Sequence, residues 1–327
     1  MTSRTLLLIS FVFLLSGCFA RKDTCPEIIR TSERLMERGV DAHASGDYVN
    51  AIEHFTLALA RYRSIDHRQG MLFSHLNLAE TTLASNRLDA AVRHIDEADV
   101  LSLELSHHDI IQRVALLKAR QYWSQQQSCK ALLQLEGLLP TFDARDHSES
   151  MPDKLQLAAL SLRTDIAFAS LQENPEEAEL WLQRLQQAIQ MAQPVDPRHY
   201  ARQQRFEARL AAWKNQPDLA LSLLDEALAT YRRKALRPAI AATLVEAAQI
   251  NWMSHSLDHA EQLLQRALFI RVWMMDRNNA REILEMLSEL YKQMGDEARA
   301  SQSQHLSEAI IDHDEEWQLL MQKIKPQ

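Results

Sequence analysis

Small and bulky apolar residues follow one another along this chain in a pattern that returns about every 40 residues. In a typical instance, Ala91 is followed by a bulky residue, Ile95, and then by a second small residue, Ala98. Residues spaced by four and seven positions share one face of an α-helix, so each instance predicts a closely packed helix. The alanines that open the pattern are separated by 40, 40, 47, 42, 40 and 40 residues, at Ala51, Ala91, Ala131, Ala178, Ala220, Ala260 and Ala300. A regular period in this range is typical of a repeat solenoid.

A second small residue stands twelve positions before most of these alanines, as at Gly39, Ala79 and Ala119. Two helices approach closely only where their side chains are small, so the paired small positions predict a helical hairpin. Turn-forming residues fall between the paired positions, as in Asn174-Pro175 and in Asn215-Gln216-Pro217. One hairpin cannot bury its apolar face alone, and we therefore expect the hairpins to stack.

This arrangement resembles the tetratricopeptide repeat, a helix–turn–helix unit in which small residues on both helices pack together. The resemblance covers residues 32–327 and implies an all-α solenoid, wound as a right-handed superhelix, of about seven repeats. The period of about 40 residues is longer than the family's usual 34 or so. The last unit is polar at Ser288, Gln304 and Ser307, as expected of a capping repeat that faces water. We expect units near 32–70, 72–108, 112–145, 155–194, 199–235, 238–276 and 278–325.

Composition agrees with a helical chain, because only 6 glycines and 9 prolines occur in 327 residues. The longest irregular stretch is expected at 140–152, where it explains the 47-residue gap and permits a bend. A C-terminal helix with Trp317, Leu320, Met321 and Ile324 either packs back on the solenoid or mediates dimerisation.

The N-terminus carries an apolar run of ten residues, 6–15, which is too short to span a bilayer comfortably and suits a signal peptide. Leu15-Ser16-Gly17-Cys18 follows and resembles the bacterial lipobox, in which the cysteine becomes lipid-modified after cleavage. The resemblance implies a signal peptide over 1–17, a lipidated Cys18 with a tether over 18–31, and a solenoid over 32–327. Phe19, in place of Asp, favours the outer membrane with the chain facing the periplasm. The alternative is an ordinary signal peptide or an uncleaved anchor.

The formal net charge of −8 argues against a nucleic-acid partner and against an anionic membrane surface. Two further cysteines, Cys25 and Cys129, either form a disulfide in an oxidising compartment or remain as free thiols.

No known catalytic motif occurs in the sequence, so we expect no enzyme activity, no cofactor and no catalytic residue. His255 and His259 have the spacing of metal ligands on a helix, with Asp258 between them. His255 is expected in the turn before a helix, however, so we expect two exposed polar residues and no metal site.

In tetratricopeptide solenoids the first helix of each unit lines the concave face. The resemblance places six arginines and three tryptophans there: Arg113, Arg120, Trp123, Arg163, Arg202, Arg205, Arg209, Trp213 and Trp252. Arginine presents a rigid fork to carboxylates, and both residue types are enriched at binding hot spots. We therefore expect a groove for an extended or helical acidic peptide. The alternative is that the tryptophans pack between units and the arginines pair with neighbouring glutamates.

Three functions remain open at this point. The first is a scaffold or adaptor, anchored to the membrane through Cys18, that binds a protein or peptide partner in cell-envelope assembly. The second is a peptide-responsive regulator, which in similar proteins is usually cytoplasmic. The third is an envelope hydrolase, which would need a pair of carboxylates in a cleft.

Overall fold

The chain folds into helices throughout the part described by the computed structural model, which comprises residues 26–139, 153–192, 195–312 and 314–324. These residues form fifteen α-helices and no strand, which confirms the all-α prediction. The helices are α2 (Glu27–Ser45), α3 (Tyr48–Ser64), α4 (Arg68–Ala84), α5 (Leu88–Glu104), α6 (His108–Ser124), α7 (Ser128–Glu136), α8 (Lys154–Ala169), α9 (Pro175–Met191), α10 (Pro197–Trp213), α11 (Pro217–Arg233), α12 (Arg237–Met253), α13 (Leu257–Trp273), α14 (Arg277–Gln293), α15 (Glu297–Asp312) and α16 (Asp314–Ile324).

Short turns of one kind join most neighbouring helices. In the turn after α4, the amide of Asn86 donates to the Leu83 carbonyl (3.0 Å) and the amide of Arg87 donates to the Thr82 carbonyl (2.8 Å). Together with a positive φ of 56° at Asn86, these bonds form a Schellman motif, which satisfies free carbonyls at the helix end. The left-handed residue recurs at intervals of 20 residues within two series, Gly46, Asp66, Asn86, Ser106 and Gln126, and then Asn215, Ala235, His255, Met275 and Gly295.

Consecutive helices pack as antiparallel pairs through their small residues. Each alanine of the sequence pattern is the fourth residue of the second helix of a pair, and all seven are buried. In the first pair, a Cβ atom added to Gly39 would overlap the ring of Phe55. Glycine is therefore required where α2 passes over α3.

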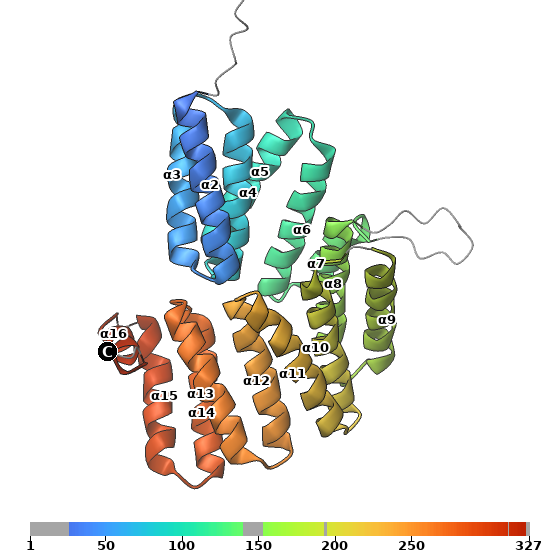
Figure 1. The fold of residues 1–327 in the computed structure, drawn as a ribbon, viewed down its shortest axis with the longest axis vertical. Coiled ribbons are helices and arrows are strands. Elements are labelled where there is room, and N and C mark those ends of the chain that lie inside the picture. The colour runs from blue at the N-terminus through green and yellow to red at the C-terminus, as the bar shows by residue number, and fades with distance from the viewer. Residues whose placement is uncertain (1–25, 140–152, 193–194, 313, 325–327) are drawn as a thin grey trace, which may run out of the picture.

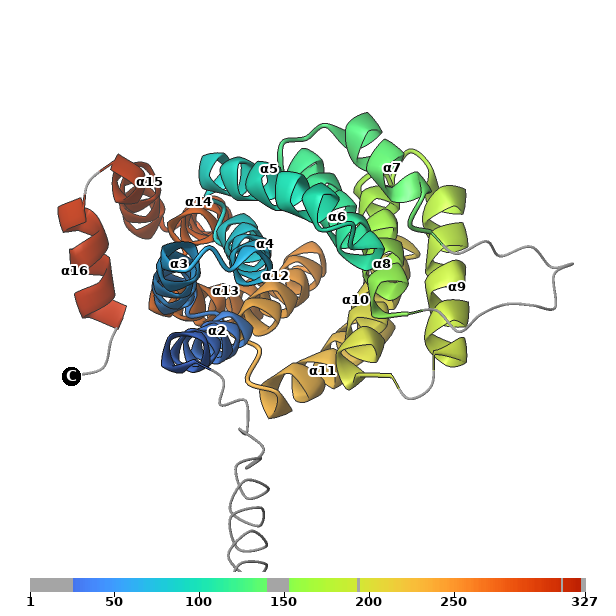
Figure 2. The same ribbon diagram turned by 90° about the horizontal axis from the view of Figure 1, so that it is seen from above.

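The stack of helices curves so that its first helices lie beside helices from the C-terminal half of the chain. Figure 1 shows α2 to α5 lying above α12 to α15, although the two groups are far apart in the sequence. Arg237 at the start of α12 donates from Nη1 to the Ser45 carbonyl at 3.1 Å. Gly46 in the same turn packs against Met274 and Pro238. We call this contact the closure contact; it joins the turn between α2 and α3 to α12 and the end of α13, and Figure 2 shows the helices arranged in a curve.

The last helix covers the end of the stack. Trp317 of α16 is fully buried and joins a cluster with Leu320, Met321 and side chains of α13 and α14. Of the two alternatives for this helix, the structure shows that it packs back on the solenoid.

Several sequence-based expectations concern residues outside the described part. The signal peptide, Cys18, Cys25 and the irregular stretch 140–152 lie there, whereas α2 already begins at Glu27, inside the expected tether. Cys129 is exposed. Among the helices that the structure describes, none is both long and apolar enough to cross a membrane.

Candidate functional site

One face of α10 carries a series of arginines that point into the curve of the molecule. Arg198, Arg202, Arg205 and Arg209 are spaced by four, three and four residues, and Trp213 follows four residues later. This spacing keeps all five side chains on one side of the helix. The first three arginines line one cavity and the last two side chains line another, so α10 connects two concave sites.

The larger site is a cavity of about 960 Å³, here called the central cavity, between α6, α8, α10 and the start of α12. Its basic side chains come from three helices: Arg120, Lys154, Arg198, Arg202 and Arg205. Asp153 and Asp196 are its acidic lining residues, and Tyr231 and Leu236 contribute to its wall. A volume of this size is within the range of ordinary ligand sites.

Most of these arginines hold carboxylates of neighbouring helices. Arg205 forms a two-pronged pair with Glu246 of α12, with Nη2–Oε1 and Nε–Oε2 distances of 2.7 and 2.8 Å. Arg202 pairs with Asp165 of α8. Burial lowers the pKa of Arg205, but Glu246, Tyr231 and Asp165 together raise it more, so the net pKa lies above the ordinary value. The ion pairs therefore connect successive hairpins across the concave side.

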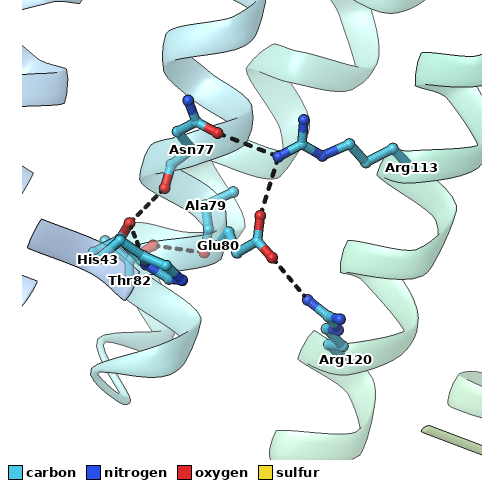
Figure 3. A network of polar contacts seen from close by, with 8 residues as sticks. His43, Asn77, Ala79, Glu80, Thr82, Arg113 and Arg120 are labelled. Carbon is cyan, nitrogen blue, oxygen red and sulfur yellow. Dashed lines mark hydrogen bonds and ion pairs between the residues drawn. The ribbon is translucent and has the colours of Figure 1, made fainter. Parts of the chain in front are cut away.

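A second group of ion pairs lies on α4 and α6 (Figure 3). Glu80 accepts from Arg113 at 3.0 Å and from Arg120 at 3.2 Å, and Arg113 also donates to Asn77 at 3.2 Å. Burial raises the pKa of Glu80, but Arg120, Arg113 and His43 together lower it below its usual value. Glu80 is therefore ionised at neutral pH.

The Glu80 group borders a further cavity of about 620 Å³ beside the closure contact. Arg198, Leu236 and Ala239 line this cavity and also the central cavity, so the two cavities adjoin. The interior surface thus extends from α2 to α12.

Three of the expected groove residues have packing roles instead. Arg163 pairs with Glu177 and stacks on the ring of Trp181. Trp123 packs against the apolar cluster of α6, α7 and α8. Trp252 donates to Gln293 and packs against the C-terminal cluster. The alternative of paired arginines also describes Arg113, Arg120, Arg202 and Arg205, which hold carboxylates of neighbouring helices. These four arginines nevertheless line cavities, as do Arg209 and Trp213.

Sequence reasoning missed Arg198, Lys154 and Tyr231 in the cavity wall. Arg198 precedes Arg202 by one helical turn, and that spacing was a usable signal. The expected fifth unit, 199–235, begins just after Arg198, whereas α10 begins at Pro197.

Among the residues that the structure describes, no three His, Cys, Asp or Glu side chains gather in a metal-binding arrangement. His255 has a φ of 60° and lies in the turn before α13, as its sequence position predicted. No protein-family model matches this chain, and no curated protein matches it.

Proposed function

We propose that this protein is a scaffold of tetratricopeptide-like repeats, anchored to the membrane through lipidated Cys18 and facing the periplasm, that binds an acidic segment of a partner protein in cell-envelope assembly. One observation carries the binding part of the proposal. The inner face of α10 presents a run of arginines to two cavities on the concave side of the molecule.

The arginines that form ion pairs within the protein still have N–H donors available for a ligand. A guanidinium group has five N–H donors, so an arginine that holds one carboxylate can hold a second. Arg202 and Arg198 both keep a substantial exposed fraction of their side chains. Lys154 lines the central cavity and has no ion-pair partner among the described residues. Acidic ligand groups would therefore find positioned cations there.

The anchor part of the proposal is supported by the sequence Leu15-Ser16-Gly17-Cys18 directly after an apolar run of ten residues. More than one acyl chain would make this attachment stable, because a single chain binds a membrane only marginally.

Crosslinked capture from the membrane-anchored protein tests the binding role. The double variant Lys154→Glu, Arg198→Glu reverses two charges in the central cavity without touching the Arg205–Glu246 pair. We expect it to retain less than a tenth of the crosslinked partner. Lys214→Glu is the control, because Lys214, the residue after α10, pairs with Glu179 and lines with it a separate cavity between α9, α10 and α11.

Equal capture by the double variant and by Lys214→Glu, at equal helical content by circular dichroism, would reject the central cavity as the binding site. Recovery of the wild-type protein in the cytoplasmic fraction would reject the anchor and favour the peptide-responsive regulator.

A further inference from the structure

The second cavity on α10 has fewer charged lining residues than the central cavity and more large apolar ones. It has a volume of about 580 Å³ and lies between α8, α10 and α12. Trp213 and Met253 remain 38 % and 66 % exposed at its edge, although both are large apolar residues. We call it the terminal pocket; its large apolar side chains include Phe168, Leu171, Trp213, Ile250 and Met253, and its polar lining residues are Gln172, Arg209, Glu246 and Gln249.

Arg209 is unlike the other arginines of the inner face. Arg198, Arg202 and Arg205 each hold a carboxylate, whereas Arg209 has no ion-pair partner among the described residues. Its Nη2 donates to the Phe168 carbonyl at 3.0 Å, and its guanidinium lies 5.1 Å from the centre of the Phe168 ring. At least three N–H donors of the fork remain for a ligand.

The charge of Arg209 is not neutralised by its surroundings. Burial lowers the pKa of this guanidinium, and the more distant carboxylates of Glu246 and Asp165 do not restore it to its ordinary value. Glu246 lines the same pocket, but its two oxygens are held by Arg205. The terminal pocket therefore combines one unpaired positive charge with an apolar wall.

We infer that the terminal pocket binds the C-terminal residue of a peptide, with its carboxylate on Arg209 and a bulky apolar side chain against Trp213 and Met253. A C-terminal residue carries both groups on one atom, the α-carbon. An internal Asp or Glu has the negative charge without the apolar group, and an internal Leu or Phe has the apolar group without the charge. The side-chain amides of Gln172 and Gln249 can bond the peptide backbone beside it.

This inference rests on the proposed function and specifies the end of the partner that is bound. Arg205 lines the central cavity and Glu246 lines the terminal pocket, so their ion pair lies between the two. A peptide that ends in the terminal pocket would extend along α10 toward Arg202 and Arg198. Acidic residues upstream of its C-terminus would then reach the central cavity.

Fluorescence polarisation on the full-length protein in detergent provides the test. The probes are fluorescein-labelled octapeptide pools with acidic residues at upstream positions. One pool ends in Leu as the free acid, a second ends in Leu as the amide, and a third ends in Ser as the free acid. We expect the first pool to bind at least tenfold more tightly than either of the others.

Substitutions at Arg209 and at Trp213 test the positive charge and the apolar wall of the terminal pocket separately. Arg209→Gln should abolish the preference for the acid over the amide, and Arg209→Lys should retain part of it by keeping the charge. Trp213→Ala should reduce the preference for Leu over Ser. Lys214→Gln removes the cation next to Trp213 in the sequence, which pairs with Glu179 and does not line the terminal pocket, and it should change neither preference.

Three results would overturn the inference. Equal binding of acid and amide pools would refute it and leave the proposed function standing, since peptides would still be bound. Failure of every pool to bind would count against both. Oleate is a further test ligand. If oleate displaces the free-acid pool and binds more tightly than that pool does, the terminal pocket binds a fatty acid and not a peptide.

Discussion

At the scale of single residues, burial changes the chemistry of side chains that look ordinary in the sequence. His75 of α4 is almost fully buried, and its Nδ1 lies 3.1 Å from Nδ1 of His94 on α5. Burial, His94 and Arg63 lower the pKa of His75 to about 4. Burial and Arg93 also lower the pKa of His94, although Glu97 opposes this. Both rings are therefore neutral at pH 7, one as donor and the other as acceptor.

This histidine pair predicts a loss of stability in mild acid. The unfolded chain binds a proton at His75 near pH 6.5, whereas the folded chain does so only near pH 4. Stability should therefore fall as the pH drops through this interval and level off below it, by about 3 kcal/mol for the fully buried ring. Chemical unfolding at a series of pH values measures the effect. His75→Gln should flatten the curve over this interval, and His259→Gln, at an exposed position, should not. Identical profiles for the two variants would contradict the prediction.

At the scale of elements, helix length is controlled by the turns. The left-handed residue of each Schellman turn ends one helix and directs the chain into the next. Ala235, between α11 and α12, has a φ of 52°, which costs a residue with a Cβ roughly 1 kcal/mol. Most equivalent turns carry Gly, Asn, Asp or another polar residue, as left-handed positions favour.

Two glycine substitutions at neighbouring positions should therefore have opposite effects. Ala235→Gly should raise the free energy of unfolding by about 0.5–1 kcal/mol, because it relieves the strained φ. Ala239→Gly, only four residues later but inside α12, should lower it by about 1 kcal/mol. Thermal unfolding of both variants and of the wild type measures these two changes in stability. A destabilised Ala235→Gly variant would show that the turn does not limit stability.

At the scale of the whole molecule, the closure contact joins segments 192 positions apart in the chain. Arg237 is its principal polar residue, because it bonds the Ser45 carbonyl and also lies 4.4 Å from the centre of the Trp273 ring. Solenoid repeats usually contact only their sequence neighbours. The additional contact restrains the curvature that shapes the interior cavities.

Arg237→Ala should open the molecule without unfolding its hairpins. We expect a larger radius of gyration by small-angle scattering and faster hydrogen exchange in the turn at Ser45–Asp47, at unchanged helical content. Arg233→Ala is the control, because Arg233 is exposed on α11 and bonds only Thr230 of its own helix among the described contacts. Equal scattering profiles for the two variants would show that Arg237 does not maintain the closure.

The sequence predicted the helical class because close packing of two helices requires small residues at regular positions along the chain. Ala51 and its equivalents must be small wherever the helices of a pair cross, so their spacing is visible without coordinates. The same register brought Arg202, Arg205, Arg209 and Trp213 onto one face. It could not separate them from Arg163, because the partners Glu177 and Trp181 lie on the next helix.

By itself, then, the sequence determined the helical hairpins and the inward series of cations on α10, because both depend on spacing along one or two helices. Only the tertiary structure decided which arginines are already paired, where the terminal pocket lies, and that α16 covers the end of the stack. It also decided the closure contact between Ser45 and Arg237. These features depend on the curvature accumulated over many helix pairs, and curvature of that kind leaves no periodic signal in the chain.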